Sequence, residues 1–254
     1  MPAQPEVKAR ERCPTPGSFP WEVVKGAILA GWRPVQVHGT SSDGVRRYIQ
    51  MLEETVKAGN LTPEYIRSLR PTLEHNFVLG NFPDVIAGIK KFGILLNVNL
   101  GYLKDAASLI DDYGEQVRPL AEPIKTWLGE GLRLTFEAEG VDFWTPIHIL
   151  VTREVVPPGK TEKVALLPEE AIDRVTALKM ATTWASEYML AEDTLGTLEP
   201  GKYADFAVLE KDFFTVPIEE IKNMQVVMTG LNGQIIWDNR SGKEKPPARS
   251  GAAE

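Results

Sequence analysis

The sequence predicts an α/β fold built on a parallel sheet. Short apolar runs alternate with segments whose apolar residues recur at helical spacing, and this order is typical of β-α-β units. Two of the runs end in a histidine, His38 and His75. Near the end of the chain the pattern changes to short alternating runs around Asn232-Gly233, a two-residue hairpin signal, which predicts a small antiparallel sheet.

The amino-terminal part predicts two helices with a strand between them. Ser18 is the expected N-cap of a first helix, which ends at Gly31. The strand Pro34 to His38 follows. The segment from Asp43 to Ala58 is amphipathic and ends at Gly59-Asn60, so we expect a second helix there.

The middle of the chain repeats this alternation. Pro63 suits the first position of a short helix that runs to about Leu69. We then expect a strand from Pro71 to His75, a helix from Phe82 to Phe92 and a strand from Ile94 to Val98, whereas residues 99–118 are expected to be less regular.

The later elements are predicted from the same signals. A helix from Ala121 to Gly131 leads to a strand from Leu132 to Phe136. The segment Pro146 to Glu154 is a further helix, and Leu167 to Leu190 is expected to be the longest one. Three strands are predicted in the tail, at Tyr203–Glu210, Gln225–Thr229 and Gln234–Trp237.

Composition excludes some partners. The 254 residues carry a formal net charge of -7, which argues against nucleic acid or an anionic membrane surface. The single Cys13 has no intramolecular disulfide partner, which favours a reducing compartment. We see no signal peptide and no apolar run long enough to span a membrane, so we expect a cytoplasmic protein.

We expect four parts along the chain. Both ends are rich in charged residues, Pro and Gly, which predicts a flexible leader at residues 1–17 and a disordered tail at 239–254. Between them we expect an α/β body at 18–195 and a small β module at 196–238.

Several motifs resemble one family. The segment from Gly196 to Leu209 reads Gly-Thr-Leu-Glu-Pro-Gly-Lys-Tyr-Ala-Asp-Phe-Ala-Val-Leu, and it resembles the closing motif of amidohydrolase family three, a branch of the amidohydrolase superfamily that includes amidases and deformylases. His38 to Asp43 is similar to the end of the family's fifth barrel strand, and Arg70 to His75 to the end of its sixth. Gly140 to Asp142 is similar to the Gly-Ser-Asp of the eighth, with Val141 in place of Ser.

This resemblance implies a fold, a site and a reaction. The fold would be a partial TIM-like (β/α) barrel covering units five to eight, with a small C-terminal antiparallel β appendage. His38, His75 and Asp142 would bind a divalent metal ion, with zinc the first choice, and Asp142 would also be the catalytic general base. The reaction would be hydrolysis of a C–N bond in a small amide-type substrate.

The sequence also departs from the family. Family members carry a His-x-His pair on the first barrel strand, and this sequence contains none. We therefore expect the second half of a barrel, whose missing half would come from a partner chain or from a second copy in a homodimer. The alternative is a truncated, non-catalytic subunit or fragment that needs a partner chain.

Each site residue also has a simpler interpretation. Asp142 suits a turn or a helix cap as well as a metal site. Two histidines and one aspartate match the ligand count of non-haem iron enzymes, although the usual close His-x-Asp pair is absent. His148 is predicted to be structural or pocket-lining, and Glu74 is expected on the opposite face of its strand from His75.

Overall fold

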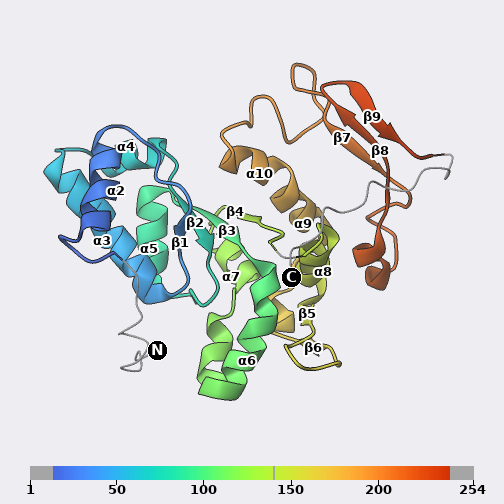
Figure 1. Ribbon diagram of the computed structural model, residues 1–254, viewed down its shortest axis with the longest axis horizontal. Helices are drawn as coiled ribbons and strands as arrows, with labels where there is room; N and C mark the ends of the chain where they lie inside the picture. The colour runs from blue at the N-terminus through green and yellow to red at the C-terminus, as the bar shows by residue number, and fades with distance from the viewer. Residues whose placement is uncertain (1–13, 140, 241–254) are drawn as a thin grey trace.

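The structure is a computed structural model that describes residues 14–139 and 141–240. Most of the predicted leader, most of the predicted tail and Gly140 of the Gly140–Asp142 motif lie outside these residues. Figure 1 shows a parallel sheet at the centre, with helices packed around it and a separate antiparallel sheet at the upper right.

The parallel sheet has four strands that pair in chain order, and this confirms the predicted β-α-β pattern. The strands are β1 (Val37–His38), β2 (Thr72–His75), β3 (Leu95–Val98) and β4 (Leu134–Phe136). In the register of the sheet, Leu73 lies opposite Leu96, which lies opposite Leu134. Because all four strands run the same way, their carboxyl ends share one edge of the sheet.

The first helices form where the sequence predicts them. They are α2 (Phe19–Leu29), α3 (Ser42–Ala58), α4 (Pro63–Ser68) and α5 (Pro83–Phe92). Ser41 and Thr62 cap α3 and α4, because their hydroxyls accept hydrogen bonds from the amides of Gly44 and Tyr65, both at 3.2 Å. Ser18 occupies the N-cap position of α2, but its side chain makes no capping bond there.

The region from 99 to 118 is more regular than predicted. A 3₁₀ turn, η1 (Leu100–Tyr102), leads into the helix α6 (Leu103–Tyr113) and then η2 (Glu115–Leu120). Gly114 separates α6 from η2 with φ 85°, a conformation that glycine adopts without steric penalty. Next comes α7 (Ile124–Gly129), which is shorter than predicted because Glu122, with φ 47°, and Pro123 precede it in non-helical conformations.

The predicted long helix from Leu167 to Leu190 is wrong, because three shorter elements replace it. After α8 (Trp144–Thr152) and a hairpin of β5 (Glu154–Val155) and β6 (Val164–Ala165), the chain forms η3 (Pro168–Glu170), α9 (Arg174–Ala181) and α10 (Thr183–Tyr188). Ala171 is extended, and Asp173 caps α9 by accepting from the Thr176 amide at 2.9 Å. Thr182 interrupts the helix with φ -128° and ψ -87°. The 17-residue α3 is longer than any of these three.

The tail forms the predicted antiparallel sheet. Its strands are β7 (Phe206–Leu209), β8 (Val226–Leu231) and β9 (Gln234–Asp238), with η4 (Ile218–Asn223) before β8. Asn232 and Gly233 join β8 to β9 with φ 49° and 74°, which suits the two-residue hairpin that their sequence predicts.

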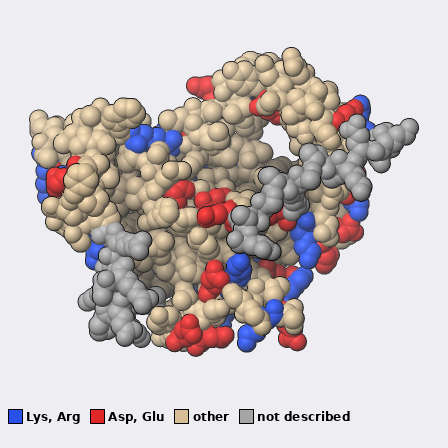
Figure 2. Space-filling model, in the orientation of Figure 1, with Lys and Arg blue, Asp and Glu red and all other residues tan. Residues whose placement is uncertain are grey.

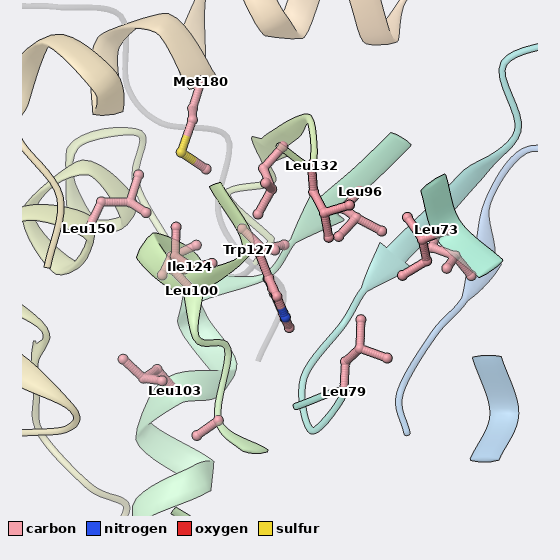
Figure 3. Close-up of a cluster of buried hydrophobic side chains, with 14 of the residues drawn as sticks. Leu73, Leu79, Leu96, Leu100, Leu103, Ile124, Trp127, Leu132, Leu150 and Met180 are labelled. Atoms are coloured by element: carbon pink, nitrogen blue, oxygen red, sulfur yellow. The ribbon is translucent and has the colours of Figure 1, made fainter. Parts of the chain in front are cut away.

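The core lies between the parallel sheet and its helices. Figure 3 shows Leu96 beside Leu132 and near Trp127, with Leu73 of the adjacent strand on one side of them and Met180 of α9 on the other. Trp127 is fully buried, and its indole N–H donates to the carbonyl oxygen of Gly80 at 2.9 Å, so burial of this polar group is compensated. These contacts hold the carboxyl edge of the sheet in place.

Charged side chains are unevenly spread over the surface. Figure 2 shows acidic side chains near the centre of one face, and acidic and basic side chains mixed along its lower part. Within the described residues, none of the helices is long and apolar enough to cross a membrane.

Candidate functional site

The carboxyl ends of β1 and β2 bring two histidines together. The ring centroids of His38 and His75 lie 4.3 Å apart in a T-shaped arrangement. His75 is buried, whereas His38 is exposed. Gly39, the residue after His38, lets the end of β1 lie close to the end of β2. A Cβ at position 39 would lie only 2.9 Å from Oδ1 of Asn76. The structure therefore brings together two of the three residues that the sequence selects as metal ligands.

The backbone turns sharply at the end of β2. His75 and Asn76 have φ 68° and 55°, a left-handed conformation that is uncommon outside glycine. Nδ2 of Asn76 donates to the carbonyl oxygens of Leu73 and Asn97, both at 3.0 Å, and these bonds hold the turn. Such strained positions are concentrated at functional sites.

Glu137, which follows β4 directly, contacts His75. Nδ1 of His75 donates a hydrogen bond to Oε1 of Glu137. Nδ2 of Asn97 lies 3.4 Å from Oε2 of Glu137 and donates to Oε2 of Glu74 at 2.6 Å. Glu74, expected on the other face of its strand, therefore joins the same polar network as His75.

Glu139 is held by the loop after β3. Its Oε2 accepts from Nδ2 of Asn99 at 3.1 Å and from the Tyr102 hydroxyl at 3.4 Å. Burial, and then the charge of Glu139, raises the pKa of Tyr102, so this hydroxyl keeps its proton and remains a donor. His75, Glu137 and Glu139 each offer one ligand atom, and these three atoms lie within 4.8 Å of one another. We call these three residues the His-Glu-Glu cluster.

Asp142 has a different environment. Its Oδ1 accepts from the amides of Trp144 and Thr145 at 3.0 and 3.1 Å, and its Oδ2 accepts from the Thr145 hydroxyl at 3.2 Å. These bonds satisfy free amides at the start of α8. This is the helix-capping role that the sequence offers as the simpler interpretation of Asp142. Neither Asp142 nor His38 belongs to the His-Glu-Glu cluster.

Sequence reasoning missed Glu137 and Glu139. Both follow the β4 strand within three residues, so the strand-end rule that selected His38 and His75 also selects them. The resemblance to a Gly-Ser-Asp motif drew attention to Asp142 instead. The set His38, His75 and Asp142 remains a prediction.

Residues 22 to 237 match the sequence profile of an amidohydrolase family. The match covers most of the chain and includes the whole parallel sheet and most of the antiparallel sheet in the tail. The chain belongs to the amidohydrolase family. The resemblance of its strand-end and tail motifs is thereby confirmed.

Solved structures share the fold of this amidohydrolase chain. An uncharacterised metal-dependent hydrolase from Pyrococcus furiosus superposes with a TM-score of 0.59 at 22% identity, over 77% of this chain and 37% of the other. A zinc-bound adenosine deaminase from Xanthomonas campestris gives 0.55 at 15%, over 87% and 48%. A mutant atrazine chlorohydrolase from Arthrobacter aurescens, complexed with zinc and atraton, gives 0.54 at 19%, over 93% and 48%.

The chain spans less than half the length of each of these three structures. A search of curated proteins finds no match. At these identities the similarity of this amidohydrolase to the three structures establishes the fold alone.

Proposed function

We propose that this chain is a metal-dependent hydrolase that cleaves a C–N bond in a small amide-type substrate. The observation that carries the proposal is the His-Glu-Glu cluster at the carboxyl edge of a parallel sheet. In α/β folds the loops at this edge carry the reactive side chains. Membership of the amidohydrolase family supports the same reaction class.

We further propose that the parallel sheet corresponds to units five to eight of a TIM-like (β/α) barrel. The four strands pair in chain order through helical crossovers, as in such a barrel. The similar structures are covered over less than half their length, which supports a partial barrel.

Cys13 supports the predicted cytoplasmic location, since it has no cysteine partner in this sequence.

The donor set fits a divalent cation. One imidazole nitrogen and two carboxylate oxygens are ligands that zinc accepts, and two of the similar structures contain zinc. His75 and Glu137 are more than three-quarters shielded from solvent, so their donor atoms are already partly desolvated. When bound, such an ion polarises a carbonyl oxygen and acidifies water.

The protein's own residues supply orientation and proton transfer. Glu137 holds the His75 ring, while Asn99 and Tyr102 hold Glu139. In the predicted mechanism the Asp142 carboxylate accepts a proton from the attacking water and then passes it to the leaving nitrogen. His38 lies beside His75 and adds a second imidazole to the site.

Metal content tests this proposal and separates the two ligand sets. The full chain is loaded with zinc, passed over a desalting column and analysed by plasma mass spectrometry. We expect about one zinc ion per chain. Retention should be lost in His75→Ala and in the double variant Glu137→Gln, Glu139→Gln.

Matched controls complete the test. A double variant of exposed acids, Glu115→Gln with Glu130→Gln, should retain the metal. If Asp142→Asn loses the metal while the Glu137→Gln, Glu139→Gln variant retains it, the ligand set His38, His75 and Asp142 would be favoured instead. If the wild-type chain retains no metal, the proposed function is wrong.

A further inference from the structure

A cavity of about 240 Å³ lies beside the His-Glu-Glu cluster. Gly101, from the loop after β3, and Val141, from the loop after β4, both line it. The same loops carry Asn99 and Glu139, and a Cβ on Gly101 would lie 3.6 Å from the Glu139 carbonyl oxygen. The cavity therefore adjoins the loops that carry Asn99 and Glu139, near the site where the reaction is proposed to occur.

Three lysines from separate elements line this cavity. Lys104 lies in the first turn of α6, Lys163 precedes β6 and Lys222 lies in η4. Glu154 also lines the cavity and pairs with Lys163 at 3.0 Å, and no ion pair joins Lys104 or Lys222 to a described residue. Three lysines and one glutamate thus give the lining of this cavity an excess of positive charge, in a chain whose formal net charge is -7. All three lysines are exposed, and their positive potential favours a bound anion.

His148 adds a buried polar group to the cavity. Its side chain is 6% exposed, and Nδ1 lies 3.4 Å from the Thr152 hydroxyl. Its Nε2 makes no hydrogen bond to any described residue. Burial is the main reason that the pKa of His148 is lowered. Lys163 and Lys222 add to this effect, whereas Glu154 and Glu219 oppose it. Lys163 and Lys222 therefore lie near this ring.

Apart from the hydroxyl of Thr145, the rest of the cavity wall is apolar, formed by Ile149, Val155 and Val156. The volume is below the roughly 300–1,000 Å³ of sites for drug-sized ligands. A ligand with one negative end and a small apolar body matches this combination of charge, size and lining.

We infer that this cavity binds the carboxylate end of a small organic acid, with Lys104 and Lys222 as its charged partners. Nε2 of His148 provides a further hydrogen-bonding position for the bound molecule. If the bound molecule is the substrate, this inference rests on the proposed function and limits the substrate class to amides that carry a carboxylate.

Phenylacetate and its neutral isostere phenylacetamide test the inference. Their binding to the full chain is measured by NMR titration in the presence of a chelator, so that a metal ion contributes nothing to carboxylate binding. Phenylacetate should bind about tenfold more tightly than phenylacetamide, because only its carboxylate can form charge-assisted hydrogen bonds with the lysines.

Exposed lysines provide the matched variants. The double variant Lys104→Met, Lys222→Met should lose this tenfold preference, whereas Lys125→Met, at an exposed position on α7, should keep it. Equal affinities of the two compounds for the wild-type chain would overturn the inference, as would an unchanged preference in the double variant. The zinc measurement decides the proposed function separately, because neither compound needs a metal ion to bind.

Discussion

Two ionisable residues, Glu122 and Arg153, are fully buried. Glu122 is fully buried, and neither of its carboxylate oxygens has a hydrogen-bond partner among the described residues. Burial raises the pKa of Glu122 well above its usual range, with a smaller contribution from Glu137, and the opposing charge of Arg153 does not reverse this. Arg153 is also fully buried, and it donates to the carbonyl oxygens of Ala121 and Leu166, both at 3.0 Å.

The raised pKa makes stability depend on pH. Above the unfolded-state pKa of about 4.3, the unfolded chain loses the Glu122 proton while the folded chain keeps it, so stability falls as pH rises. Glu122→Gln removes this effect. We expect the variant to be more stable than the wild type at pH 7.5, by a margin that shrinks at pH 4.5. Urea unfolding, monitored by tryptophan fluorescence, measures the free energy of unfolding of the wild type and the variant at each pH.

A less stable Glu122→Gln variant at pH 7.5 would contradict this prediction. It would mean that the carboxylate is ionised and stabilised by Arg153 in the folded state. Glu130→Gln, at an exposed position, is the control and should change stability little at either pH.

At the scale of elements, the strand-to-helix loop after His38 depends on its cap. The Ser41 hydroxyl accepts from the Gly44 amide at 3.2 Å, whereas Ser18 makes no equivalent bond at the start of α2. Ser41→Ala should lower the free energy of unfolding by about 1 kcal/mol, and Ser18→Ala should lower it less. Chemical unfolding of both variants checks the difference, and equal losses would contradict it.

The same loop needs glycine where β1 meets β2. A Cβ on Gly39 would lie 2.9 Å from Oδ1 of Asn76 and 3.2 Å from Cγ2 of Val45. Gly39→Ala should therefore destabilise the fold by about 1–3 kcal/mol and displace His38 from His75. Thermal unfolding and the histidine NMR signals report the two effects.

Gly26→Ala is the matched control for this prediction. Gly26 lies inside α2, and no atom lies within 4 Å of a Cβ built there. Alanine should stabilise that helix by roughly 0.5–1 kcal/mol. A Gly39→Ala variant as stable as the wild type would show that Asn76 moves aside freely.

At the scale of the whole molecule, the parallel sheet has two open edges. Among the described residues, β1 pairs only with β2, and β4 pairs only with β3. Unpaired edges favour association with another strand, and parallel sheets are generally covered on both faces. These edges support the predicted homodimer or partner chain.

Sedimentation velocity over a range of protein concentrations tests this association. We expect a species of twice the chain's mass that grows with concentration. A monomer at every concentration would contradict the homodimer. A monomer that also retains no zinc would favour the non-catalytic alternative, in which a separate partner chain is required.

The core that supports the sheet is also a property of the whole molecule. Leu96 is fully buried between Leu73 and Leu134 on the neighbouring strands. Leu96→Ala should lower the free energy of unfolding by about 2–5 kcal/mol. Leu198→Ala, at a position that is 71% exposed, is the control and should have little effect.

The sequence by itself determined the elements that depend on local signals. Apolar periodicity predicted the four strands, and Pro63 and Asn232-Gly233 marked a helix start and a hairpin. The prediction of one long helix from Leu167 to Leu190 was wrong, because apolar spacing gives no sign of the helix start that Asp173 caps or of the break at Thr182. Local competition of this kind is decided by hydrogen bonds that spacing alone does not reveal.

Only the tertiary structure decided which polar groups meet. His75 reaches Glu137 because β3 lies between β2 and β4 and because the backbone at His75 turns into the left-handed region. Asp142 bonds to the first turn of α8, although the family motif marked it as a ligand. Distances between strand ends depend on sheet order and on this backbone turn, and residues far apart in sequence come together only through them.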